Sequence, residues 1–136
     1  MELKYYKLNE EEREKLIEDL RAKLEVYEDI VFAYVHGSFL RGRFRDVDVA
    51  IWIRGGKVEA FHYTVEVSSE LSKEFPVDLH VLNEAPVPFQ YHVFTKGRLL
   101  FSRDERARSE AVDRALKVYL DFREFLRSLG RISSPS

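Results

Sequence analysis

A Gly-Ser turn followed by closely spaced aspartates is the part of this sequence best suited to chemistry. Gly37 and Ser38 end an apolar run at 30–35, and Asp46 and Asp48 open the next one. Glycine lets the backbone turn sharply and approach a ligand closely, and the serine adds a hydroxyl beside backbone N–H groups. If residues 38–41 form a helical turn, these donors point at an anion. The spacing therefore predicts a phosphate cradle next to a pair of carboxylates.

Asp46 and Asp48 stand two positions apart in a predicted strand, so both side chains should project from the same face of the sheet. Asp78 lies early in a later predicted strand and would join them if the two strands are neighbours. Two bare carboxylates about 4 Å apart repel by about 4 kcal/mol at an effective dielectric of 20. Metal ions remove that penalty, and carboxylate oxygens suit Mg²⁺. We therefore predict a metal site formed by Asp46, Asp48 and Asp78.

The predicted elements that hold these residues alternate between helices and strands. A helix begins at Asn9, which with Glu12 forms a capping box. The last helix is predicted to start at Ser102, with Glu105 completing a second box. The other predicted elements are strands at 30–35, 46–53, 77–82 and 99–101 and helices at 61–75 and 89–96. This order predicts an α/β (α+β) domain with a small mixed sheet covered by helices.

The last predicted helix carries an apolar stripe that we expect to be core. Its members recur at helical spacing: Ala111, Ala115, Val118, Phe122, Phe125 and Leu129. An alternative is that Tyr119, Phe122 and Phe125 face a partner subunit. Trp52 is expected in the core rather than beneath a nucleobase.

Length and composition indicate one domain. The chain has 136 residues, of which 45% are hydrophobic, and we expect a single domain at 1–130 with a flexible tail at 131–136. A net charge of −2 gives no general attraction to nucleic acid or membranes. The chain has no cysteine, no apolar run long enough to cross a bilayer and no apolar core of a secretory signal, so we expect a cytoplasmic protein.

Two other groups of residues have ambiguous patterns. Arg41, Arg43 and Arg45 form a basic loop that is as well explained by solvation as by contact with phosphate or nucleic acid. The four histidines lack metal-ligand spacing and are expected at the surface or, satisfied, in the core.

Three stretches of the chain, at 37–48, 77–86 and 91–103, carry a family resemblance. The DNA polymerase beta-like nucleotidyltransferases have a Gly-Ser turn, an Asp-x-Asp strand and a later third aspartate, and this sequence resembles them in each respect. Within that superfamily it looks most like the minimal nucleotidyltransferases, the MNT antitoxins that are paired with HEPN toxins. It departs from the family's commonest pattern at Arg45, where serine is usual, and in a shorter loop before the aspartates.

The resemblance implies a role for each residue of the motif. The Gly37-Ser38 turn would hold the β- and γ-phosphates of ATP, and Arg41 would assist with phosphates or structure. Asp46 and Asp48 would bind Mg²⁺, with two ions in the site. Asp78 would bind the catalytic metal and help to deprotonate the acceptor hydroxyl.

The function that the resemblance implies is transfer of AMP from ATP to a tyrosine of a partner HEPN toxin, which silences that ribonuclease. An alternative is a non-catalytic antitoxin that neutralises the toxin by stoichiometric binding. A third is a transferase acting on a small molecule or an RNA end, which the short chain disfavours because such enzymes usually need an added substrate domain. The sequence is compatible with a homo-oligomer as well as a hetero-oligomer.

Overall fold

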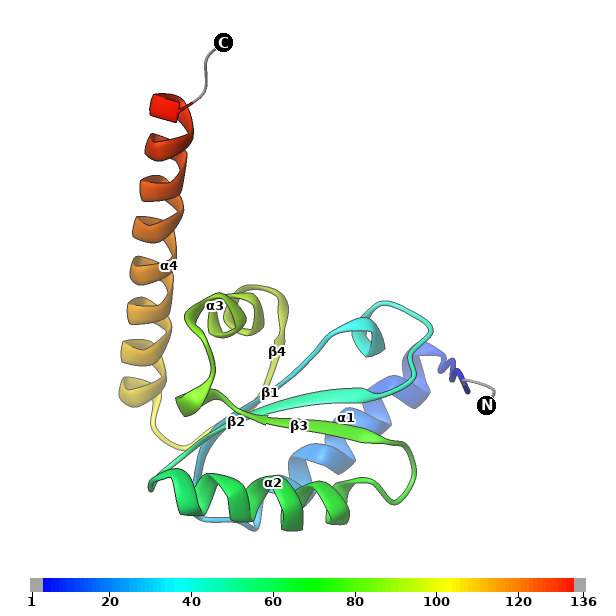
Figure 1. Ribbon diagram of the computed structural model, residues 1–136. Coiled ribbons are helices and arrows are strands. Elements are labelled where there is room, and N and C mark those ends of the chain that lie inside the picture. The colour runs from blue at the N-terminus through cyan, green and yellow to red at the C-terminus, as the bar shows by residue number, and fades with distance from the viewer. Residues whose placement is uncertain (1–3, 134–136) are drawn as a thin grey trace.

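The computed structural model describes residues 4–133, with the side chains of 57–59 and 131–133 excepted. Its centre is a four-stranded sheet in the order β3-β2-β1-β4 (Figure 1). The strands are β1 (Ile30–His36), β2 (Val47–Ile53), β3 (Val77–Val81) and β4 (Arg98–Ser102). The first two strands pair antiparallel, as do β1 and β4, whereas β2 and β3 are parallel. The predicted mixed sheet is therefore confirmed, with β4 at an edge.

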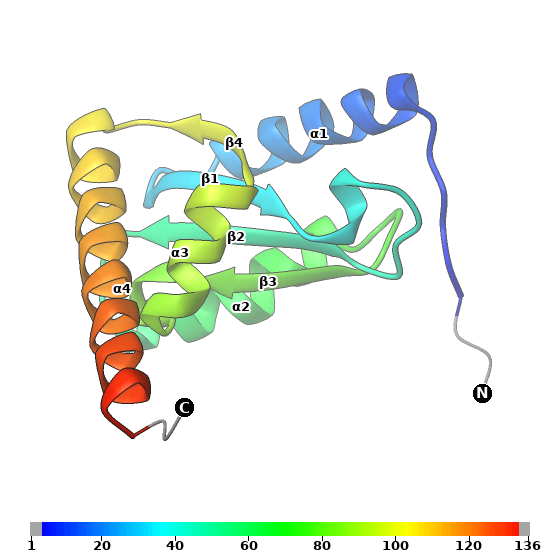
Figure 2. The same ribbon diagram turned by 90° about the horizontal axis from the view of Figure 1, so that it is seen from above.

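Helices cover both faces of this sheet. They are α1 (Glu10–Glu25), α2 (Lys57–Leu71), α3 (Val87–Lys96) and α4 (Glu105–Ser133), with short 3-10 turns η1 (Ser38–Leu40) and η2 (Leu82–Glu84). The crossover between the parallel strands β2 and β3 is made by α2, because parallel neighbours cannot be joined by a hairpin. Seen from above, α3 and α4 lie on one side of the sheet and α2 on the other (Figure 2).

Two hydrophobic clusters follow from the alternation along the strands. Val35, Val49 and Ile51 pack with α1 and α2 on one face, and Phe32, Tyr34 and Ala50 pack with α3 and the start of α4 on the other. Asp48 shares the parity of Ala50 along β2, so it belongs to the face that α3 covers. The sheet thus presents its acidic residues on the side of α3.

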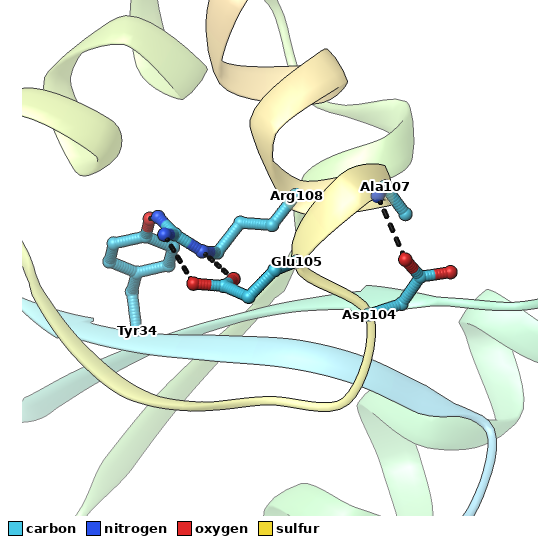
Figure 3. Close-up of polar contacts among 5 residues, drawn as sticks. All are labelled: Tyr34, Asp104, Glu105, Ala107 and Arg108. Carbon is cyan, nitrogen blue, oxygen red and sulfur yellow. Dashed lines mark hydrogen bonds and ion pairs between the residues drawn. The ribbon is translucent and has the colours of Figure 1, made fainter.

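Capping explains where the first and last helices begin. Asn9 Oδ1 accepts from Glu12 N at 2.8 Å and Glu12 Oε1 accepts from Asn9 N at 2.9 Å, which confirms the predicted box. The predicted start of α4 at Ser102 is wrong. Ser102 stays in β4 opposite Phe32, and Asp104 instead accepts from Ala107 N at 3.0 Å (Figure 3). The sheet ladder therefore holds the chain extended for longer than the capping signal suggested. Similarly, α2 ends at Leu71, before the predicted stop at Pro76.

The first turn of α4 is fastened to β1. Arg108 Nη1 donates to Tyr34 Oη at 2.9 Å, and the same guanidinium donates to both carboxylate oxygens of Glu105 at 2.6 and 2.9 Å (Figure 3). This bidentate pairing with Arg108 lowers the pKa of Glu105 to about 2. The contact fixes the direction in which the long helix leaves the sheet.

The prediction that the apolar stripe of α4 is core is wrong beyond its first turns. Ala111 and Ala115 are buried, but the exposed fractions of Val118, Phe122 and Phe125 are 45%, 52% and 57%. The cause is length, because α4 has 29 residues whereas α3, which packs beside it, has 10. Figure 1 shows the second half of α4 standing clear of the sheet.

The helix passes through Gly130 to Ser133, so the first residues of the predicted tail are helical, and residues 134–136 lie outside the described part. Among the described residues, no helix combines the length and apolar character that a bilayer crossing needs.

Candidate active site

Parallel pairing brings the second and third aspartates together. In the register of β2 and β3, Asp48 lies opposite Asp78, and Ala50 lies opposite His80. The neighbouring strands place Asp48 and Asp78 side by side on the face that α3 covers. Asp78 can approach Asp48 only if β2 and β3 are neighbours, as the sequence analysis stated. The two strands are adjacent in the sheet, so this condition is met.

Gly37 lies directly against the Asp48 carboxylate. A Cβ at this position would lie 2.2 Å from Asp48 Oδ2, and the backbone has φ +84° and ψ −161°, a region that is essentially reserved for glycine. The following residue, Ser38, is exposed and opens η1. The turn therefore brings the backbone into contact with the acidic group, and its approach to a phosphate ligand stays a prediction.

A hollow of about 270 Å³ opens beside this turn. It is lined by Asp46 and Asp48 together with residues of the basic loop that joins β1 to β2. Its lining residues are Tyr5, Ser38, Arg43, Phe44, Arg45, Asp46 and Asp48. The guanidinium of Arg43 stacks over the Tyr5 ring at 4.7 Å. The hollow thus combines a serine, two cations and two carboxylates, a set that suits a metal-bound phosphate chain.

Arg41, which the family resemblance placed near the phosphates, is exposed at the end of η1 and is not among the described residues that line this hollow. Arg43 and Arg45 occupy that place instead. The sequence signal for them was the basic loop itself, which by composition alone did not distinguish a solvated arginine from one that faces the site.

His80 is a further site residue that spacing arguments missed. Its Nε2 lies 3.1 Å from Asp78 Oδ2. One candidate ligand atom from each of Asp48, Asp78 and His80 lies within 4.8 Å of the others, and Asp46 is not part of this set. The overlooked signal was the i, i+2 relation of Asp78 and His80 on one strand, the same relation that identified Asp46 and Asp48.

His36, at the end of β1, lies on the same face of the sheet as these residues. It is 5% exposed, and its Nε2 has no hydrogen-bond partner among the described residues. Its ring contacts Phe89 edge-on at 5.5 Å. Burial, and then the neighbouring His80 and His92, lower the pKa of His36 to about 4. The buried ring is therefore neutral at pH 7, and the core expectation for this histidine is met, although without a satisfied Nε2.

The electrostatics of the two aspartates fit a cation. Burial raises the pKa of Asp48, and the nearby Asp78 raises it further. A divalent ion between the two carboxylates would offset both effects, and oxygen donors at this separation are ligands for a hard cation. The residues present therefore fit the divalent metal that the acidic motif predicts.

A second hollow, of about 450 Å³, begins at His80 on the other side of the aspartates. It lies between the end of β3, η2 and the start of α3. Its lining is formed by His80, Val81, Glu84, Ala85, Pro86 and Phe89. The rings of His80 and Phe89 lie 5.0 Å apart. No described residue of this lining is a lysine or an arginine.

A mixed sheet with paired aspartates beside a Gly-Ser turn defines the class of metal-dependent nucleotidyltransferases. The family model for Polymerase beta, Nucleotidyltransferase matches residues 18–106. The chain belongs to this family, and it is a nucleotidyltransferase. A comparison with curated proteins finds no match.

Solved structures share the fold at low sequence identity. One is a tri-AMPylated HEPN toxin of Shewanella oneidensis in complex with its MNT antitoxin (16% identity, 86% of this chain and 94% of that chain, TM-score 0.64). Another is the toxin–antitoxin pair MntA-HepT (18% identity, 85% and 94%, TM-score 0.62). A third is a toxin–antitoxin structure with AMP-PNP (20% identity, 90% and 95%, TM-score 0.59). The resemblance drawn from the sequence is thus confirmed for the family and the fold.

Proposed function

We propose that this protein transfers AMP from ATP to a hydroxyl of a partner HEPN toxin, most simply a tyrosine, and so acts as an antitoxin in the cytoplasm. The observation that carries the proposal is the in-register pair Asp48 and Asp78 with Gly37 packed against it. The structures similar in fold support the choice of partner, since they contain MNT antitoxins with HEPN toxins and, in one case, an AMPylated toxin.

The roles of the residues follow from their positions. The Gly37-Ser38 turn, with Arg43 and Arg45 across the hollow, would hold the β- and γ-phosphates. Asp46, Asp48 and Asp78 would bind two Mg²⁺ ions, which when bound supply charge stabilisation at the phosphoryl centre. Asp78 would accept the proton of the attacking hydroxyl.

A non-catalytic antitoxin is the second candidate, and the exposed face of α4 favours it. Val118, Phe122 and Phe125 are about half exposed on a helix that extends from the body. Exposed apolar residues of this size are suited to partner binding. Neutralisation could then rest on contact with the toxin and leave the carboxylates unused.

Mass spectrometry of the toxin distinguishes the two candidates. A HEPN-type toxin would be incubated with this protein, ATP and Mg²⁺. We expect one or more AMP masses on a tyrosine, and their loss with Asp48→Asn. The matched control is Asp19→Asn, an exposed aspartate of α1. A stable complex without added mass would replace the catalytic proposal by the binding one.

A further inference from the structure

The hollow that begins at His80 is placed to receive the acceptor, whereas the hollow at Ser38 is placed to receive the phosphates. Asp48 lies at the start of β2 and Asp46 just before it, and the lining of the Ser38 hollow includes both of them and the loop before that strand. His80 lies two residues beyond Asp78 along the parallel strand β3, about 7 Å further in the strand direction. The paired aspartates therefore lie between the two hollows.

In-line displacement at phosphorus requires this arrangement. The attacking and leaving oxygens lie on opposite sides of the phosphorus atom. If the pyrophosphate leaves toward Ser38 and the arginines, the hydroxyl must arrive from the side of Asp78 and His80. On that side the structure has a hollow of about 450 Å³, within the range of ligand pockets.

The lining of this hollow selects the class of acceptor. Phe89 and His80 offer two rings 5.0 Å apart, and Val81, Ala85 and Pro86 are small or apolar. Aromatic rings pack favourably against such rings in offset or edge-on contacts. The charged member of the lining is Glu84, which repels phosphate. An RNA end carries phosphates that need cations, so this lining disfavours it.

We propose that the hollow lined by His80, Ala85, Glu84 and Phe89 is the acceptor subsite and that it takes the phenol ring of a tyrosine presented by a protein. This inference rests on the proposed AMP transfer. In the step, the phenol oxygen forms a bond to the α-phosphorus while the bond from that phosphorus to the α–β bridging oxygen breaks. Pyrophosphate leaves with the electron pair, and the phenol proton passes to the Asp78 carboxylate.

Two variants and one control test the subsite. Ala85→Leu fills the hollow without removing a core side chain, and Phe89→Leu removes one ring. Phe61→Leu is the matched control, since Phe61 is 72% exposed on α2, which covers the other face. The acceptors are an end-capped peptide with one tyrosine, the same peptide with serine or phenylalanine in its place, and a short RNA with a free 3′-hydroxyl. Labelled AMP from α-³²P-ATP is counted on each.

We expect the tyrosine peptide to be labelled at least tenfold faster than the serine peptide and the RNA, and the phenylalanine peptide to stay unlabelled. Both subsite variants should raise the KM for the tyrosine peptide about tenfold and leave the KM for ATP unchanged, Phe89→Leu because it loses an aromatic contact and Ala85→Leu because its larger side chain occupies the hollow. Phe61→Leu should change neither. A raised KM for ATP with an unchanged acceptor KM would mean that the hollow holds the nucleobase, and faster labelling of RNA would also overturn the proposal.

A binding measurement separates the subsite from the transfer reaction. Saturation-transfer NMR would follow the ring protons of N-acetyl-L-tyrosinamide with the wild-type protein, Mg²⁺ and α,β-methylene-ATP. If no acceptor is labelled but the ring protons saturate, and Ala85→Leu abolishes this, the proposed AMP transfer fails and the tyrosine subsite stands. If the ring protons do not saturate, or if they saturate equally in Ala85→Leu, the subsite is refuted whatever the transfer assay shows.

Discussion

Gly37→Ala should inactivate the enzyme by moving one carboxylate, while Gly42→Ala in the same loop should not. The Cβ of an alanine at position 37 would lie 2.2 Å from Asp48 Oδ2 and 3.2 Å from its Cγ. The Asp48 carboxylate would have to move away from position 37 and so leave its present place beside Asp78, its partner across the strands. At Gly42 a Cβ meets nothing within 4 Å, and its φ is not in the left-handed region.

The structure sets the size of both effects. At position 37 the backbone has φ +84° and ψ −161°, and an alanine held there costs about 1–3 kcal/mol of stability. Displacement of a reacting group by about 1 Å typically costs about 100-fold in rate. We therefore expect Gly37→Ala to lose at least about 100-fold in AMP transfer. Gly42→Ala should change stability by no more than about 1 kcal/mol, in the stabilising direction if its backbone suits alanine.

Urea denaturation and AMP transfer, measured on the same preparations, test this reasoning. Both variants would be compared with the wild type at a saturating Mg²⁺ concentration. If Gly37→Ala keeps wild-type transfer, the close approach to Asp48 has no bearing on the reaction. If Gly42→Ala loses as much activity as Gly37→Ala, the loop as a whole, rather than the contact with the carboxylate, is responsible.

Three further outcomes follow from the charges and caps. Burial and Asp78 raise the pKa of Asp48 above its usual 3.8, so ionisation of this carboxyl group lowers the stability of the folded protein as the pH rises. Asp48→Asn should therefore be at least as stable as the wild type at pH 7, as measured by urea denaturation. The same variant should lose any rise in Tm that Mg²⁺ causes in the wild type. Burial lowers the pKa of His36 from 6.5 to about 4. As the pH falls, this imidazole is therefore protonated in the unfolded chain at a higher pH than in the folded protein. Up to about 3 kcal/mol of the free energy of unfolding should be lost between pH 6.5 and 4. His36→Phe should abolish that part of the pH dependence, and an unchanged pH profile would show that another group causes it. Asp104→Ala should reduce the free energy of unfolding by about 1 kcal/mol, and so lower the Tm, because α4 loses its N-cap. The control Asp113→Ala, at an exposed position of the same helix, should reduce it by less than half of that.

The two ends of α4 show where local signals were sufficient and where they were not. The apolar period of the helix predicted its existence, because side chains at helical spacing share one face in any setting. Its first residue depended on competition between a cap at Ser102 and the sheet ladder that holds Ser102 opposite Phe32. Burial of the stripe depended on the length of its neighbour α3, which no pattern within α4 reveals.

One short segment of the sequence was enough to predict the chemistry of the candidate site. Gly37, Ser38 and the aspartates at 46 and 48 lie within twelve residues of one another, so a turn followed by the start of a strand keeps them close. The predicted strand start at Asp46 is wrong by one residue, since β2 begins at Val47 and Asp46 lies just before it. The covered faces of the sheet were likewise fixed by alternation along β2. These are short-range properties, and they need no knowledge of the rest of the chain.

The distant residues that join this candidate site could not be predicted from such a segment, because strand pairing and helix packing bring them there. Asp78 and His80 reach it because β3 pairs with β2 in parallel and in register, and a slip of one residue would have turned both side chains to the opposite face. Arg43 and Arg45, rather than Arg41, line the hollow at Ser38 because the loop returns at that point to β2. Phe89 closes the second hollow because α3 folds back over the end of β3. The positions of Asp78, His80 and Phe89 depend on the packing of segments far apart in the chain, which hydrophobic periodicity does not encode.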